Sequence, residues 1–401
     1  MSAAAPVQYA PYGINSNPNQ QTAPSTSQAQ QAAPAGLPFN FSAKRLEVEG
    51  NQFSAQPLDG TGFFNAPIPA EGFIEGVEID VNATGGVNGA KTVTAHADSP
   101  WNAIASLIVS DARGTQLHTL DGYAGYLVQR YLGSSLFAVE NDTNSFTAVS
   151  TGGSGTGNFN FKLKIPIQYR PDGAGCLPNS NQSAAYKVAT KFNTATNVYA
   201  SPSTGQPGTL PTLSGVVRLN GRIIPPTTDV YGRPTSITPP IYKSYMVTES
   251  ESVPGGTVVG QNTYYLARVG NPYRALMLIY RASDGTRATA VSAGNFPTIL
   301  GLQIDTFVKY QSINVGALAK RVYEKTGLVV PAGVVVLPFD KDILHGIGVD
   351  YDDIMATLAG TSAKLFWTSA AGGGTVQVLT ADIVSPDGGL GVTAGIINEA
   401  L

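Results

Sequence analysis

Alternating apolar and polar side chains predict β-strands along most of the chain. The clearest alternation runs over residues 159–169, where apolar side chains take every second position and Lys162 and Lys164 stand between them. A period of two predicts a strand with one face on a core and the other in water or in an interface. Pro166 lacks a backbone N–H, so this strand is expected at a sheet edge or a bulge. Similar patterns predict further strands at 45–49, 77–81, 184–192, 214–224, 242–248, 263–269, 276–281, 302–310, 333–339, 364–369 and 375–384.

Two stretches, 100–115 and 272–286, share one order of residue types: Pro, an aromatic, a polar residue, Ala, an apolar run, and a turn that ends in Gly-Thr. Each is followed by a predicted short helix, at 120–132 and 315–326, and then by a strand that carries proline. The copies are about 170 residues apart, which is the size of a domain, so we interpret the pattern as a duplicated domain. A chance echo within a β-rich chain is the alternative.

Turn-forming residues indicate the fold class. The 401 residues include 45 glycines and 27 prolines, more than the usual share. Short strands separated by such turns are typical of sandwiches and jelly rolls. We therefore predict an all-β fold with short helices in its loops. The predicted domains are an N-terminal arm at 1–44, a first sandwich or jelly roll at 45–228, a Pro-rich linker at 229–240 and a second sandwich or jelly roll at 241–401.

The arm has an unusual composition. Residues 1–43 contain no charged side chain and are rich in Ala, Pro, Gln, Ser and Asn. Such a segment cannot bury enough apolar area to offset the entropy lost on ordering. We expect an arm that is disordered or that orders only against a partner, and a tail without a role is the alternative.

Low charge is the second compositional feature. Charged residues make up only 13% of the chain, against roughly 25% in average soluble proteins. Because a free monomer uses charge to stay soluble, we infer that other subunits cover much of the surface. An uncharged surface rich in Ser, Thr and Asn, as on a secreted β-protein, is the alternative. The net charge of −3 comes without a Lys/Arg-rich block, so direct nucleic-acid binding is not expected.

Neither a disulfide nor a membrane span is predicted. Cys176 is the single cysteine, so no intrachain disulfide can form, which fits folding in a reducing cytoplasm. The N-terminus lacks the basic and apolar regions of a signal peptide. The longest apolar stretch, 327–339, is too short to cross a bilayer and contains two prolines.

We expect no catalytic, cofactor-binding or metal-binding residues. The histidines His96, His118 and His345 lie in different predicted segments, and none has a His or Cys partner at metal-ligand spacing. A cluster of aspartates lacks the Gly and Glu of a calcium loop, so a solvated acidic loop is the preferred interpretation and a calcium site the alternative. The cluster consists of Asp340, Asp342, Asp350, Asp352 and Asp353.

Two sequence motifs are interpreted as having no function. The glycine-rich segment 152–157 precedes a strand, whereas a phosphate-binding loop must open a helix. Glycosylation sequons begin at Asn82, Asn141 and Asn181. They are expected to be chance matches, because no secretion signal accompanies them.

Several segments together resemble one protein family. They are the strand and turn at 100–115, the run 165–170 followed by 172–179, the strand at 184–192, and the run 271–276 leading to Asp284-Gly285. In pattern and order the chain resembles the double jelly-roll major capsid proteins of tectivirus-like phages. These phages are tailless, contain an internal membrane and belong to the lineage of adenovirus hexon. The resemblance covers most of residues 45–345.

The resemblance implies two eight-stranded jelly rolls in tandem and a structural role without enzyme activity. It further implies a homotrimer that forms a pseudo-hexagonal capsomer. Such capsomers would tile an icosahedral virion shell around an internal membrane and a dsDNA genome, after synthesis in the host cytoplasm. Implied partners are further copies of the chain, neighbouring capsomers, and penton, vertex and minor capsid proteins. The arm at 1–44 would lie on the inner side, toward the membrane, although it is richer in proline than is typical of the family.

Two other function classes stay open. A two-module β-sandwich that binds carbohydrate or a cell surface, such as a viral spike or fibre component, would expose aromatic side chains on one sheet face. The two tryptophans, Trp101 and Trp367, lie instead in apolar strand contexts. An enzyme with an acidic site at 340–353 is the third possibility.

Overall fold

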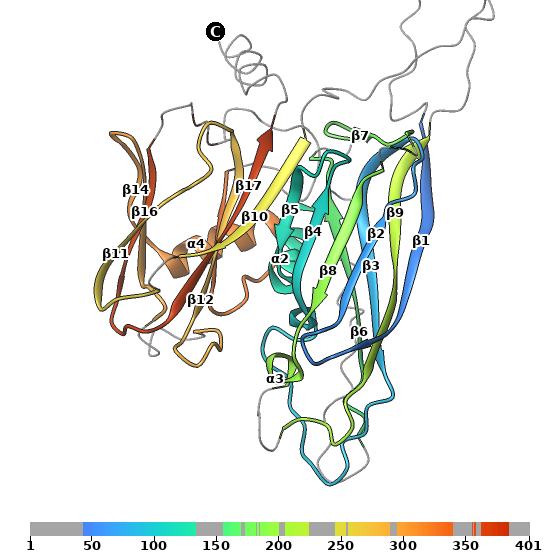
Figure 1. Ribbon diagram of the computed structural model, residues 1–401. Coiled ribbons are helices and arrows are strands. Elements are labelled where there is room, and N and C mark those ends of the chain that lie inside the picture. Colours follow the sequence, from blue (N-terminus) through green and yellow to red (C-terminus); the bar gives the residue numbers. More distant parts are fainter. Residues whose placement is uncertain are drawn as a thin grey trace, which may run out of the picture. The chain divides into compact units, whose positions relative to one another are not determined.

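The computed structural model describes residues 43–133, 155–169, 173–181, 183, 185–199, 205–223, 245–253, 256–288, 295–339, 355, 357 and 362–384. Strands predominate among them, as predicted, and Figure 1 shows them gathered into sheets that face one another. The helices within these residues are η1 (Trp101–Ala103), α2 (Gly122–Leu132), α3 (Ala195–Val198) and α4 (Val315–Thr326). None of them is long and apolar enough to cross a membrane.

The first half of the chain folds into two sheets. One has the order β1 (Lys44–Pro57), β9 (Thr212–Ile223), β3 (Phe73–Thr84) and β6 (Phe159–Pro166), with the two-residue β7 (Leu177–Pro178) paired to β3. The other has the order β2 (Phe63–Pro67), β8 (Lys187–Phe192), β4 (Ile104–Ser110) and β5 (Gln116–Leu120). Apolar side chains of both sheets point into one core, which the alternation on β6 and β3 predicts.

The second half repeats this arrangement. One set of strands has the order β10 (Tyr245–Ser252), β17 (Thr375–Val384), β12 (Tyr273–Arg281) and β15 (Val334–Pro338). The facing sheet has the order β11 (Gly260–Tyr265), β16 (Ala363–Ser369), β13 (Ile299–Ile304) and β14 (Phe307–Asn314). A second hydrophobic core lies between them.

Both halves have the same strand order. Ranked along the chain, with β7 left aside, the strands of each half follow 1-8-3-6 in one sheet and 2-7-4-5 in the other. Eight antiparallel strands connected in this way across two facing sheets form a jelly roll. The chain is therefore an all-β double jelly roll, as predicted, with a short helix between the fifth and sixth strand of each half.

The internal match expected from the sequence is wrong in one respect. We expected 100–115 to correspond to 272–286, but β4 is the fourth strand of its half and β12 is the third, so the counterpart of β12 is β3. The shared residue order reflects turn chemistry. Asp111 accepts hydrogen bonds from two backbone N–H groups after β4, and Asp284 accepts one from Thr286 after β12. The helices α2 and α4 and the strands β6 and β15 do correspond.

The single strand predicted at 302–310 is also wrong, because β13 and β14 form a tight hairpin there. Asp305 turns the chain with a φ of 49°, a left-handed conformation that Asp tolerates better than most residues. Its carboxylate accepts the backbone N–H of Ser362 at 2.6 Å, which holds the hairpin against β16. The Asp-Thr turn carries no glycine, so the sequence pattern did not reveal it.

One continuous sheet joins the two halves. β10 pairs in parallel with β5, with Thr248 opposite His118, and so creates an eight-stranded sheet with the order β15-β12-β17-β10-β5-β4-β8-β2. β12 is buried on both faces as a result. Leu276 and Leu278 face the second core, whereas Met277 and Ile279 belong to the cluster that includes the first core and α2.

The predicted domain boundaries fall mostly outside the described residues. This holds for the linker at 229–240 and for all but the end of the arm at 1–44, whose last residue, Lys44, already begins β1.

Candidate functional site

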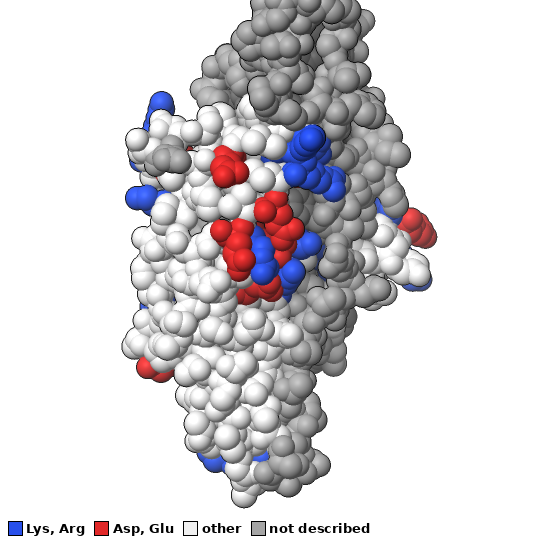
Figure 2. Space-filling model, turned by 90° about the vertical axis from the view of Figure 1, so that its right-hand side faces the viewer, with Lys and Arg blue, Asp and Glu red and all other residues white. Residues whose placement is uncertain are grey.

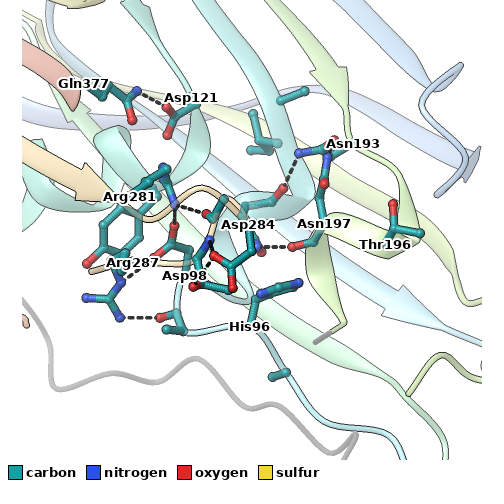
Figure 3. Close-up of a pocket in the computed structure, with 18 of the residues that line it drawn as sticks. His96, Asp98, Asp121, Asn193, Thr196, Asn197, Arg281, Asp284, Arg287 and Gln377 are labelled. Atoms are coloured by element: carbon teal, nitrogen blue, oxygen red, sulfur yellow. Dashed lines mark hydrogen bonds and ion pairs between the residues drawn. The ribbon is translucent and has the colours of Figure 1, made fainter. Parts of the chain in front are cut away.

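A cavity of about 960 Å³ opens where the two jelly rolls meet (Figure 3). The first half contributes His96, Asp98 and Tyr123 to its lining, and the second half contributes Arg281 and Arg287. The loop before η1 carries the first two of these residues, and α2 carries the tyrosine. The cavity therefore exists only when both halves are folded and joined.

Asp98 is the centre of the ion pairs across this seam. Its side chain is buried and forms an ion pair with Arg281 and another with Nε of Arg287, at 2.5 Å. Arg287 also donates to the carbonyl of Ala97 at 2.7 Å, and its guanidinium lies 5.0 Å from the ring centroid of Tyr123. One carboxylate thus holds two guanidinium groups of the other half in a poorly solvated place, where an unpaired charge would be costly.

A second polar link joins α2 to the second half. The carboxylate of Asp121 caps α2 by accepting the backbone N–H of Ala124 at 2.8 Å. The same carboxylate accepts a hydrogen bond from the side-chain amide of Gln377 on β17 (Figure 3). The helix start is therefore tied to the neighbouring jelly roll.

His118 lies inside the continuous sheet, at the parallel pairing of β5 with β10. It is fully buried, and its Nδ1 lies 2.7 Å from Oγ1 of Thr248. Among the described residues, Nε2 has no hydrogen-bond partner. Burial lowers the pKa of His118 to about 3, so the ring is neutral at ordinary pH and serves as an uncharged hydrogen-bonding partner.

These groups suit a joint better than a reaction centre. The carboxylate and the guanidinium groups are engaged with one another across the seam. No group of three or more His, Cys, Asp or Glu side chains within the described part of the chain could hold a metal ion. These contacts fix the position of one jelly roll relative to the other.

A second polar feature lies on the outer face of the sheet β1-β9-β3-β6. One row across its four strands reads Glu49, Arg218, Glu78 and Lys164, with opposite charges on neighbouring strands. We name this row the charged ladder. Figure 2 shows acidic and basic side chains gathered on this side of the molecule, with uncharged surface around them.

Glu78 is the centre of the charged ladder. Burial opposes its ionisation, but the hydrogen bond and charge of Lys162 outweigh this and lower the pKa of Glu78. Lys162 lies 3.0 Å, Arg218 3.3 Å and Lys164 3.7 Å from its carboxylate oxygens. Opposite charges on adjacent strands stabilise a sheet, and here they replace the apolar contacts that an outward face would make with a covering layer.

Of the candidate histidines and aspartates, the structure describes two, and they lie in different parts of the fold. His96 is half-buried in the seam cavity and His118 is buried in the sheet. His345 and the cluster Asp340, Asp342, Asp350, Asp352 and Asp353 lie outside the described residues.

The two motifs expected to have no function can be followed in part. Of the segment 152–157, residues 155–157 are described and lead into β6, as predicted. Asn82 is exposed on β3 and Asn181 is exposed in a loop, while Asn141 lies outside the described residues. Cys176 is buried and forms no disulfide.

Sequence reasoning missed the seam residues. Asp98 and Arg281 are 183 positions apart, and neither belongs to a local motif. The charged ladder left a clearer signal. Glu78 and Asp80 alternate with valine and isoleucine on one predicted strand, and Lys162 and Lys164 alternate with apolar residues on another, so opposite charges at outward positions of two strands indicated that those strands are neighbours.

No protein-family model matches the sequence, and no curated protein matches it either. Solved structures do match. The STIV major capsid protein has a TM-score of 0.60 at 13% identity, over 86% of this chain and 97% of that chain. A chain in the atomic structure of Sulfolobus Turreted Icosahedral Virus has a TM-score of 0.58 at 14% identity, over 89% and 96%. A chain of the PBCV-1 virus capsid has 0.56 at 12% identity, over 85% and 93%.

At such low identity the likeness concerns the fold, and it extends over both jelly rolls because nearly the whole of each matched chain is covered. The chain thus has the double jelly-roll fold of viral major capsid proteins, as its sequence resemblance implied.

Proposed function

We propose that this chain is a structural, non-enzymatic major capsid protein that forms a homotrimer. The observation that carries the proposal is the duplicated jelly roll with its two halves joined into one sheet, in a fold matched over 97% of the STIV major capsid protein. Three such chains would place six jelly rolls in a ring and give a pseudo-hexagonal capsomer.

The composition supports a subunit that is covered by neighbours. Only 13% of the residues are charged, and Figure 2 shows large uncharged areas around the charged ladder. Interfaces are depleted of charged residues at their cores. Asp98, Arg281 and Arg287 form ion pairs with one another across the seam, which suits a protein whose task is to hold a shape.

The finer parts of the proposal concern the particle. Capsomers would tile an icosahedral virion shell around an internal membrane and a dsDNA genome, with penton, vertex and minor capsid proteins as further partners. The arm at 1–44 would reach neighbouring subunits or the membrane, and synthesis would take place in the host cytoplasm. The sequence resemblance points to tectivirus-like phages, whereas the matched folds include a Sulfolobus virus and PBCV-1. We therefore propose a capsid protein of the double jelly-roll lineage and do not assign a type of host.

Light scattering coupled to size exclusion tests the trimer. A trimer of the 41.7 kDa chain would have a mass of about 125 kDa, and electron microscopy of purified material should reveal pseudo-hexagonal particles. A monomer at micromolar concentration that forms no shells would contradict the proposal.

The carbohydrate-binding alternative receives less support. Trp101 and Trp367 are buried, at 9% and 2% exposure, so neither offers a sugar-stacking surface. The large aromatics with the highest exposure in the described chain are Phe63, Tyr265 and Tyr323, which lie on β2, β11 and α4 and so do not share one sheet face. Glycan binding by a monomeric chain would favour this alternative.

A further inference from the structure

The inference starts from the two corresponding helices, α2 and α4. Each begins at an N-cap whose side chain accepts a hydrogen bond from the backbone three residues on, Asp121 from Ala124 and Asn314 from Ala317. Each lies between the fifth and sixth strands of its jelly roll and packs on the sixth, β6 or β15. Aligned on the caps, the two helices can be compared position by position.

α2 is covered on two sides. Gly125 and Gln129 face β6, since a Cβ on Gly125 would lie 3.4 Å from Ile165 and Gln129 accepts the backbone N–H of Lys164. The opposite side, with Leu127 and Tyr131, belongs to the hydrophobic cluster that includes the outward face of the second half. That outward face consists of Met246, Ala275, Met277, Ile279, Val334, Val336, Leu379, Ala381 and Ile383.

α4 is covered on one side only. Leu318 and Val322, which match Gly125 and Gln129, are buried. On the opposite side, Lys320 and Glu324 stand where α2 has Leu127 and Tyr131, and both are exposed.

The helix face of α4 also carries an exposed aromatic ring. Tyr323 is 53% exposed, and Arg321 is exposed beside it. Large aromatics at this exposure are typical of contact surfaces. We name Lys320, Arg321, Tyr323 and Glu324 the α4 outer face.

The sheet surfaces differ in the same way. The outward face of β10-β17-β12-β15 is apolar and covers α2. The face at the corresponding position in the first half, on β1-β9-β3-β6, carries the charged ladder, with Glu47 and Glu49 exposed on β1. Apart from the Asp121–Gln377 bond and the ion pairs of Asp98, both members of the internal contact are apolar, whereas both of their counterparts are charged.

We propose that the α4 outer face of one chain docks on the charged ladder face of a second copy, repeating in charged form the apolar contact that joins the two halves within a chain. Lys320 and Arg321 would pair with Glu47 and Glu49 of the second copy, and Tyr323 would become buried. The contact is head-to-tail, because each chain offers a helix to one neighbour and a sheet to the other. Such contacts form a ring when the rotation from one chain to the next closes after three copies. The inference rests on the proposed homotrimer and names the surfaces that build it.

The change from apolar to charged has a physical reason. The internal contact forms once during folding and is never exposed, whereas a contact between chains must remain soluble before assembly. Paired charges provide register and a fast encounter, and they avoid the aggregation that an exposed copy of the apolar face would cause.

Charge reversal at the two surfaces tests the contact. The variant Lys320→Glu/Arg321→Glu should lose the trimer and elute as a folded monomer, with mass falling threefold, and so should Glu47→Lys/Glu49→Lys. In an equimolar mixture every contact between unlike variants is complementary, so the two variants should associate into mixed species. A ring of three keeps one repulsive contact between like variants, so the mixture should not recover the full trimer. A chain with all four substitutions should regain the trimer. The matched control is Lys187→Glu/Lys191→Glu, the same charge change on exposed residues of β8, and it should stay trimeric.

The outcomes separate this contact from the proposed function. A wild-type monomer at low salt would overturn both. A trimeric wild type whose α4 variant also stays trimeric, a mixture of variants that fails to associate, or a control that loses the trimer as well would overturn the contact and leave the capsid proposal standing. Far-UV circular dichroism of each variant identifies any loss of fold, and association in the mixture depends on both chains being folded.

Discussion

A few side chains at the seam form direct contacts between the two halves. His118 and Thr248 meet inside the sheet, and Asp98 meets Arg281 and Arg287 at the cavity. Each pair joins one half to the other, so a change at one of these positions tests the joint without altering either core. Two predictions follow from the burial of these groups.

The first prediction concerns acid. The folded chain holds His118 neutral, with a pKa near 3 against 6.5 in the unfolded chain. Below pH 6.5 the unfolded chain takes up a proton that the folded chain cannot, so the free energy of unfolding falls as pH falls from 6.5 toward 3. The loss is about 1.4 kcal/mol per pH unit. His118→Asn can keep the hydrogen bond to Thr248 and removes the titration.

Urea unfolding of wild type and His118→Asn at pH 7 and pH 5 measures this effect. Wild type should lose about 2 kcal/mol more than the variant between these two pH values. Equal losses in the two proteins would show that the ring is accessible to protons in the folded state.

The second prediction concerns the seam carboxylate. Asp98→Asn leaves two guanidinium groups without their counter-charge and should lower the free energy of unfolding by about 3 kcal/mol. Asp284→Asn is the matched control, because Asp284 lines the same cavity but hydrogen-bonds within its own turn, to Thr286. Chemical denaturation measures both, and a loss in the control as large as in Asp98→Asn would contradict the assigned role.

Helices and strands with the same rank in the two halves have acquired different surroundings. α2 is buried almost completely, whereas more than half of the residues of α4 are exposed. The cap residues differ correspondingly. The carboxylate of Asp121 caps its helix and also accepts a hydrogen bond from Gln377 of the other half, whereas the side chain of Asn314, within the described residues, caps its own helix only. Position in the fold, and not helix propensity, determines how much each helix contributes to the stability of the folded chain.

Removing the two caps tests this difference. Asn314→Ala should lower the free energy of unfolding by about 1 kcal/mol, the usual value of an N-cap. Asp121→Ala should cost about 2 kcal/mol, because a charge-assisted hydrogen bond across the seam is lost in addition. Thermal or urea unfolding of both variants measures the difference, and equal losses would indicate that the bond to Gln377 contributes nothing.

The chain combines two jelly rolls with an N-terminal segment, residues 1–43, that carries no charge. The described residues from Ala43 onward contain both hydrophobic cores and the strands that enclose them. From their uncharged, low-complexity composition we expect that residues 1–43 are not needed for either core. Under the proposed function this arm acts between subunits, where an extended segment can order on binding.

Deleting residues 1–43 tests the arm. The shortened chain should retain its fold and the trimer mass, and the yield of closed shells in an assembly reaction should fall to background. Light scattering and electron microscopy measure the two quantities. An unfolded product, or shells formed at the wild-type yield, would contradict the role assigned to the arm.

Local physics explains what could be read directly from the sequence. Period-two alternation revealed β3 and β6, a continuous apolar run revealed β15, and helical periodicity revealed α4 at its observed bounds. Two similar halves and the all-β class followed from the order of these elements. Each of these features depends on residues within about one strand or helix of each other, and so it appears in the chain itself.

Only the tertiary structure decided which strands become neighbours. In the structure β5 pairs with β10, and Asp98 contacts Arg281. β12 corresponds by rank to β3 of the first half, not to β4 as the sequence suggested. Pairing across more than a hundred residues depends on how whole sheets pack and on which surfaces the second half covers. The same strand order thus has a mainly apolar outward face on β10-β17-β12-β15, where the two halves meet, and a charged outward face on β1-β9-β3-β6.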